Sequence, residues 1–178
     1  FPEETLVINL EGFDCLTFVE NVIALVNNAN SPTPSYQNFA NELEKLRYRD
    51  GLNSGWISRL HYATDWIFDN DKRHNLKNIT LDYHGLKVVR DIRYMSRYFD
   101  RYAALRNDTA NQHKIRIIEN NIIKRCSYCY IPKNELKKVS KQIPSGCIIF
   151  IATNIYLLDY SHTGITYQKD GKLYFIHA

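Results

Sequence analysis

A cysteine stands directly before a long apolar segment near the start of this chain. Cys15 follows Asp14 and precedes residues 16–26, in which apolar side chains recur at helical spacing. Asp is a favoured N-cap residue, so we expect Cys15 in the first turn of a helix that is apolar nearly all round and therefore buried. Unpaired backbone N–H groups and the positive dipole end favour a thiolate there. The segment thus predicts a nucleophilic Cys15; the alternative is a small structural residue in the core.

Two histidines flank a hairpin predicted at the end of the chain. A two-residue loop at Asp170-Gly171 would place His177 opposite Gly164. Because side chains alternate along strands, His162 and His177 would then be diagonal neighbours on one face, about 7–8 Å apart or less at Cβ. A four-residue loop gives the same result, and a three-residue loop puts them on opposite faces. One histidine could therefore orient the other, as in a catalytic triad; unrelated structural roles are the alternative.

The elements expected to position these residues are helices first and strands last. Helices are predicted over residues 15–27, 35–49, 59–68, 94–105, 112–124 and 132–142. Strands are predicted over residues 79–83, 86–89, 126–131, 147–153, 161–168 and 172–177. This segregation indicates an α+β fold with a short antiparallel sheet. We expect a single catalytic domain over residues 1–178, trimmed at both ends, since the chain starts and stops abruptly.

The composition argues against two classes of function, nucleic-acid binding and membrane spanning. A hydrophobic content of 44% and a charged content of 24% are ordinary for a soluble globular protein. The net charge of +4 is too mild to indicate a nucleic-acid partner. No apolar run approaches the length that spans a membrane.

The pair Cys126-x-x-Cys129 has the spacing of half a zinc site. On a strand, however, the two sulfurs would point to opposite faces, and a second pair of ligands is lacking. We therefore expect neither a metal nor another cofactor.

Five blocks of sequence together resemble one known family. They are residues 6–20 (LVINLEGFDCLTFVE), 47–49 (RYR), 58–62 (SRLHY), 130–133 (YIPK) and 158–165 (LDYSHTGI). These blocks, in this order, are similar to those of the bacterial N-acetylmuramoyl-L-alanine amidase-like family. That family is a branch of the NlpC-type cell-wall cysteine peptidases of the papain-like superfamily. The resemblance implies a papain-like fold in which helices pack on a small antiparallel sheet.

The resemblance also implies an activity and its residues. The bond cut would join the lactyl group of N-acetylmuramic acid to the L-alanine of the stem peptide. Cys15 would be the nucleophile, His162 the general base and His177 the residue that orients His162. Substrate contacts are implied for Asp14, Arg59, His61, Tyr62 and Ser161. For Arg59 the alternative is a surface arginine at a capped helix start.

The partners implied are peptidoglycan fragments (muropeptides), acted on by a monomer in the bacterial periplasm or outside the cell. Two other functions stay open at this point. One is an endopeptidase that cuts between D-glutamate and the diamino acid of the stem peptide. The other is a silent relative that only binds wall fragments.

Overall fold

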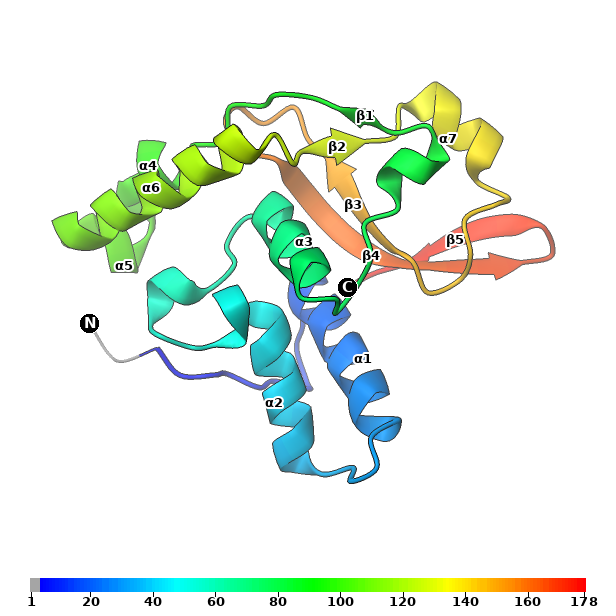
Figure 1. Cartoon of the computed structure of the whole chain (residues 1–178), viewed down its shortest axis with the longest axis horizontal. Helices are drawn as coiled ribbons and strands as arrows, with labels where there is room; N and C mark the ends of the chain where they lie inside the picture. The colour runs from blue at the N-terminus through cyan, green and yellow to red at the C-terminus, as the bar shows by residue number, and fades with distance from the viewer. Residues whose placement is uncertain (1–3) are drawn as a thin grey trace.

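The computed structural model describes residues 4–178; residues 1–3, with which the expected domain begins, lie outside the described residues. The fold is α+β, with helices first and a three-stranded antiparallel sheet last (Figure 1). The α-helices are α1 (Cys15–Ala29), α2 (Tyr36–Arg47), α3 (Ala63–Lys72), α4 (Tyr94–Arg97), α5 (Ala103–Arg106), α6 (Thr109–Arg125) and α7 (Lys133–Val139). The 3-10 helices are η1 (Arg49–Gly51), η2 (Trp56–Ser58), η3 (Thr80–Tyr83) and η4 (Phe99–Arg101).

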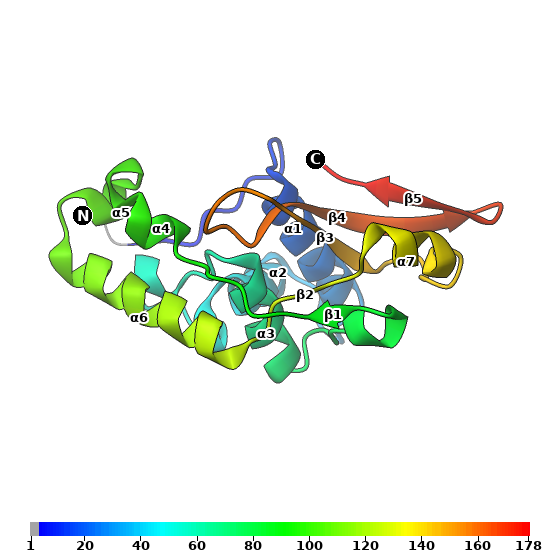
Figure 2. The same ribbon diagram turned by 90° about the horizontal axis from the view of Figure 1, so that it is seen from above.

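The strands form two separate sheets. They are β1 (Leu86–Lys87), β2 (Cys129–Tyr130), β3 (Ile148–Ala152), β4 (Tyr160–Lys169) and β5 (Lys172–Ile176). β1 pairs with β2, and the larger sheet has the order β3-β4-β5, antiparallel throughout. Figures 1 and 2 show α4, α5 and α6 at one end of the molecule and the β4–β5 hairpin at the other.

Helix α1 begins where the sequence predicts. Asp14 is the N-cap, and its carboxylate accepts a 2.7 Å hydrogen bond from the backbone N–H of Thr17. The Thr17 hydroxyl in turn accepts a 3.0 Å hydrogen bond from the N–H of Asp14. This reciprocal capping box fixes the first turn of α1 and makes Cys15 its first residue.

The prediction that α1 is buried nearly all round is wrong. Leu25 and Val26 are 47% and 53% exposed, whereas Glu20 and Asn21 are buried. The reason is that α1 packs on α2 and on β4, which cover one side of the helix and leave the other in solvent. Burial of Glu20 is possible because Arg47 and Trp66 donate hydrogen bonds of 2.8 Å and 3.1 Å to its carboxylate.

The hairpin register is confirmed. Lys169 pairs with Lys172 and Ile165 with Ile176, so the loop is Asp170-Gly171. Both loop residues have positive φ, 50° and 72°, as the turn that matches the twist of a hairpin requires. β4 also pairs with β3, and a register shift follows Ile151, the partner of His162.

Two predicted elements have a different structure. Within residues 79–83, predicted as a strand, Thr80–Tyr83 form the 3-10 helix η3 and Ile79 is its N-cap. The Asn78 side chain accepts hydrogen bonds from both the N–H and the hydroxyl of Thr80 and so starts a turn. The third helix begins at Ala63, not at Arg59. Arg59 instead pairs with Tyr48 in an isolated β-bridge, which holds residues 59–62 outside the helix.

The helix predicted over residues 94–105 is broken into α4, η4 and α5. Tyr98 leaves the helical conformation at φ −117° and ψ 42°. Its ring packs 4.8 Å from that of Tyr94, and the Arg101 guanidinium lies over Tyr98 and donates to the Tyr94 hydroxyl at 2.9 Å. These side-chain contacts favour the break over a continuous helix.

Two hydrophobic clusters support the helices and the sheet. One joins α1, α2 and α3 and contains Leu43, Leu46 and Trp66; the other lies against α6 and contains Leu105, Ile115 and Ile122. Phe150 of β3 packs against both clusters and so ties the sheet to the helices. Among residues 4–178, no helix combines the length and the apolar character that crossing a membrane requires.

Candidate active site

Cys15 lies at a helix start that is close to the end of the chain. Its thiol is free and half-buried. The C-terminal end of the chain, one residue beyond His177, lies beside the first half of α1 in both views (Figures 1 and 2). The first and last functional candidates of the sequence therefore come from neighbouring segments.

His162 and His177 are in contact, as the register predicts. Their ring centroids are 4.8 Å apart with the planes at 80°. His177 also stacks on Phe175 at 5.2 Å, which limits how its ring can turn. Gly164 lies two residues after His162 on β4, and a Cβ there would stand 2.4 Å from the Ile176 carbonyl oxygen and 2.7 Å from the Phe175 ring. A glycine is therefore required for β5 to approach so closely.

The predicted short distance between the Cys15 sulfur and the His162 ring stays a prediction. α1, which begins with Cys15, packs against β4, which carries His162. Within residues 4–178 the thiol and this imidazole are not joined by a hydrogen bond. Such contacts are often long in unliganded enzymes and tighten when substrate binds.

Asp14 and Ser161 flank Cys15 and His162 in the chain. The Asp14 carboxylate is used in the helix cap, which it shares with the N–H and the hydroxyl of Thr17. Ser161 is exposed on β4. Both are near the candidate catalytic residues, and only Ser161 keeps a side chain that is not needed for local structure.

Tyr62 has a structural role, which differs from the substrate contact expected. Its side chain is only 2% exposed. The hydroxyl donates to Glu119 Oε1 at 2.7 Å and accepts from the N–H of Met95 at 2.8 Å. Burial, together with the nearby Glu119, raises the pKa of Tyr62 well above its ordinary value. The hydroxyl is thus occupied inside the fold.

His61 packs on the neighbouring 3-10 helix η2. Its ring lies 4.1 Å from that of Trp56, and its Nε2 is 2.9 Å from the Trp56 carbonyl oxygen. Burial lowers the pKa of His61 to about 4, so the ring is neutral at pH 7. Arg59, two residues earlier, is half-buried.

Nearly the whole chain, residues 2–178, matches one family, described as N-acetylmuramoyl-L-alanine amidase-like. The chain belongs to this family. The resemblance to the amidase-like family is therefore confirmed, whereas the placement in the NlpC-type, papain-like superfamily stays a prediction.

Solved structures of related proteins agree with this membership. A Bacteroides uniformis N-acetylmuramoyl-L-alanine amidase is 35% identical, with a TM-score of 0.82 over 99% of this chain and 74% of that one. A Bacteroides fragilis protein named as a candidate xylanase is 33% identical, with a TM-score of 0.86 over 100% and 77%. A Legionella pneumophila protein, 24% identical with a TM-score of 0.65 over 95% and 65%, shares the fold. No curated protein matches the chain.

Several carboxylates of this amidase-like protein are buried although the sequence did not predict it. Burial raises the pKa of Glu20, and Arg47 opposes the rise. Asp65 is held between Arg49 and Arg125, and Asp159 accepts a 2.7 Å hydrogen bond from the N–H of Thr64 at the start of α3. The sequence signal for such a residue is an acidic side chain inside an apolar helical segment, as Glu20 is between Val19 and Ile23.

The Cys126-x-x-Cys129 pair does not lie on one strand. Cys126 has φ 48° and ends α6, and only Cys129 belongs to β2. The Cys126 thiol lies 3.6 Å from the Ile123 carbonyl oxygen, and the Asn78 amide lies 3.6 Å from the Cys129 sulfur. In the described part of the chain, no three His, Cys, Asp or Glu residues are grouped as metal ligands would be.

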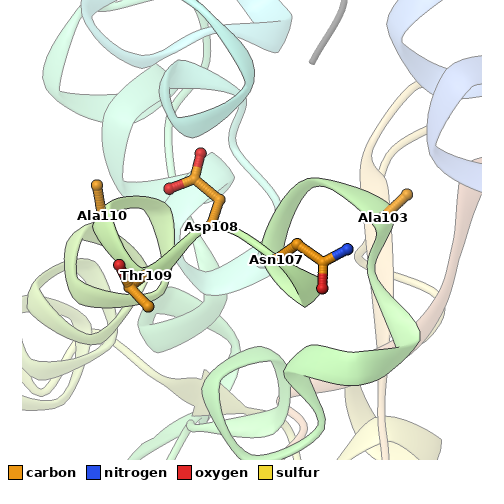
Figure 3. Close-up of a pocket in the computed structure, with 5 residues that line it drawn as sticks. All are labelled: Ala103, Asn107, Asp108, Thr109 and Ala110. Carbon is orange, nitrogen blue, oxygen red and sulfur yellow. The ribbon is translucent and has the colours of Figure 1, made fainter.

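A hollow of about 370 Å³ lies away from these residues, at the start of α6 (Figure 3). It is lined by Ala103, Asn107, Asp108, Thr109 and Ala110. The Asp108 carboxylate caps α6 by accepting a 2.8 Å hydrogen bond from the N–H of Asn111. None of the candidate catalytic residues lines this hollow, so we assign no chemistry to it.

Proposed function

We propose that this protein is a cysteine amidase of the NlpC-type, papain-like class, which acts on peptidoglycan fragments. The bond cut joins the lactyl group of N-acetylmuramic acid to the L-alanine of the stem peptide. The observation that carries the proposal is the placement of Cys15 at the capped start of α1, packed on the strand whose His162 touches His177. Family membership and the named Bacteroides uniformis amidase support the substrate.

The chemistry follows from these three side chains. His162 accepts the thiol proton of Cys15, and the thiolate attacks the amide carbonyl carbon. The C–N bond then breaks, and His162 returns the proton to the departing amine of L-alanine. Water, activated by His162, hydrolyses the thioester and restores the thiol. His177, edge-on to His162, holds the orientation and tautomer of that ring.

The helix start supplies a second element of catalysis. The first N–H groups of α1, that of Cys15 included, have no partner within the helix. They can donate to the oxyanion that forms when the carbonyl is attacked, and the dipole of a 15-residue helix favours negative charge at this end.

The Bacteroides fragilis neighbour is named as a candidate xylanase, and a xylanase cleaves a glycosidic bond, not an amide bond. Glycoside hydrolysis generally uses two carboxyl groups that flank the bond. In this protein two acids close to Cys15 in sequence are engaged: Asp14 caps α1, and Glu20 is paired with Arg47. The geometry therefore favours amide cleavage by Cys15.

Digestion of a disaccharide-tetrapeptide, read by mass spectrometry, tests the proposal. We expect free disaccharide and intact tetrapeptide, and no reaction with Cys15→Ala. Release of a disaccharide-dipeptide would instead show an endopeptidase. Binding without cleavage would show a silent wall-fragment module.

We further propose that the protein acts as a monomer in the periplasm or outside the cell, where wall fragments are found. Sedimentation at micromolar concentration and fractionation of the producing cells test these two points. A dimer in the first experiment, or a cytoplasmic pool in the second, would contradict them.

A further inference from the structure

The segment between η2 and α3 presents two polar side chains on one side. Leu60 and Tyr62 are each 2% exposed and belong to the core. The intervening His61, and Arg59 before Leu60, are half-buried. The bridge from Arg59 to Tyr48 and the 3.0 Å hydrogen bond from the Leu60 N–H to the Arg47 carbonyl hold this stretch extended. In extended backbone, residues two apart point to the same side, so Arg59 and His61 share a surface.

His61 offers a hydrogen-bond acceptor on that surface. A carbonyl oxygen can only accept, so the 2.9 Å contact with Trp56 requires the proton on Nε2. Since burial lowers the pKa of His61, the ring is neutral and Nδ1 carries a lone pair. Nδ1 has no hydrogen-bond partner among residues 4–178. The Trp56 ring, 4.1 Å away, fixes the imidazole in this orientation.

Arg59 offers a cation whose donors are unused. Five other half-buried or buried arginines are paired with carboxylates: Arg47, Arg49, Arg73, Arg93 and Arg125. Within residues 4–178 the Arg59 guanidinium has no ion pair and no hydrogen bond. Leu60, the next residue, is in one hydrophobic cluster with Ala24 of α1, against which Leu16 of α1 also packs. Arg59 is therefore held next to a residue that packs against α1, the helix that begins with Cys15.

We propose that Arg59 and His61 form a specificity subsite for one amino-acid residue of the substrate, binding its free α-carboxylate and its own N–H. Arg59 donates to the carboxylate, and His61 Nδ1 accepts from the N–H on the same α-carbon. The inference rests on the proposed function and names the part of the stem peptide that is read.

The chemistry of the stem peptide identifies that residue. An ordinary peptide residue has lost its α-carboxylate to the next amide bond. A residue linked onward through its side chain keeps it, as the γ-linked D-glutamate of stem peptides does. The subsite therefore favours stems with a free D-glutamate α-carboxylate over stems in which this group is an α-carboxamide.

A matched pair of substrates tests this. Two disaccharide-tetrapeptides, identical except for α-carboxylate or α-carboxamide on D-glutamate, are compared with the intact protein. We expect roughly a 10- to 100-fold preference for the carboxylate in kcat/KM, mostly through KM, since a charge-assisted hydrogen bond is lost with the amide. Arg59→Gln should abolish the preference and Arg59→Lys should retain part of it. Arg116→Gln, at an exposed arginine on α6, is the control and should behave as wild type.

Binding to Cys15→Ala, measured by calorimetry with the same two ligands, separates this inference from the cleavage reaction. A preference that depends on Arg59 supports the subsite even where no bond is cut. Equal affinity for the two ligands, binding of neither, or a preference that persists in Arg59→Gln would overturn it. The wild-type comparison of ligands needs no variant, so misfolding of Arg59→Gln cannot decide the outcome.

Discussion

Two groups of polar side chains in this protein differ in how fully they are paired. Beneath α1, the buried carboxylate of Glu20 is held by Arg47 and Trp66, and that of Asp65 by Arg49 and Arg125. The candidate catalytic group, from the start of α1 and from β4 and the end of the chain, contains a free thiol, the half-buried His162 and the exposed His177. The two histidine rings contact each other and Phe175.

This difference in pairing distinguishes side chains that stabilise the fold from side chains that are available to react. A buried charge is tolerated only when partners replace the water it loses, so the paired carboxylates are part of the fold. A side chain that reacts with substrate, by comparison, must have atoms that are not already bonded to other groups of the protein. Asp14, Glu20 and Asp65 are therefore engaged in the fold. Within residues 4–178, by contrast, the side chains of Cys15, His162, His177 and Arg59, and the Nδ1 atom of His61, have no hydrogen-bond or ion-pair partner.

The largest effect is expected for the nucleophile. Cys15→Ala should reduce amide hydrolysis by at least about 10⁴-fold, because covalent chemistry stops. Its free energy of unfolding should change by less than about 1 kcal/mol, since only a half-buried sulfur is removed. Product analysis and denaturant unfolding check the two halves. Turnover near the wild-type level would remove Cys15 from the mechanism.

The paired group should respond in the opposite way. Arg47→Ala leaves Glu20 buried without its partner and should lower the free energy of unfolding by about 3–5 kcal/mol. Lys72→Ala is the control, because the Lys72–Asp50 pair is 3.3 Å long and exposed, and such pairs contribute about 0–1 kcal/mol. Urea unfolding measures both. Similar losses in the two variants would contradict the distinction between buried and exposed pairs.

His61 predicts a pH dependence of stability. Its folded pKa of about 4 lies below the ordinary 6.5, so between these values the unfolded state binds more protons. Stability therefore falls as pH is lowered from 6.5 to 4, by up to about 3 kcal/mol from this residue. In Glu20 and Asp159 the pKa is raised by burial, and these act in the opposite direction. The difference in pH dependence between wild type and His61→Gln gives the contribution of the histidine. If the two proteins lose stability equally as pH is lowered, the half-buried ring is not held neutral by the fold.

The smallest effect is expected for the orienting residue. His177→Ala should lower kcat by roughly 10- to 100-fold with little change in KM, because His162 stays in place but loses its edge-on neighbour. Steady-state kinetics on the disaccharide-tetrapeptide measure this. A loss as large as that of Cys15→Ala would give His177 a direct part in the chemistry.

Much of the site could be predicted because it depends on local rules. Asp14 caps a helix by its own side chain, and Asp170-Gly171 suits a two-residue hairpin loop, which sets the register of His162 and His177. The α+β class followed from the order of helices and strands. Each of these inferences needs only residues near in sequence.

Several of the errors come from contacts between distant residues. Residues 59–62 stay extended because Arg59 pairs with Tyr48, and the buried face of α1 includes Glu20 because Arg47 lies across from it. Tyr62 was expected to contact substrate, but its hydroxyl donates a hydrogen bond to Glu119 of α6. Periodicity within a segment carries no information about such partners.

The reactivity of Cys15 tests the central claim most directly. Alkylation by iodoacetamide at pH 7, followed by peptide mass spectrometry, gives a rate for each cysteine in one experiment. Cys147 is the internal control, because it is also half-buried and burial raises the pKa of its thiol, which Thr166 only partly opposes. If the α1 start and His162 activate Cys15, it should react at least about tenfold faster than Cys147, and His162→Ala should remove most of that advantage. Equal rates for Cys15 and Cys147, or a fast Cys15 that is indifferent to His162, would contradict the assignment of a cysteine–histidine amidase.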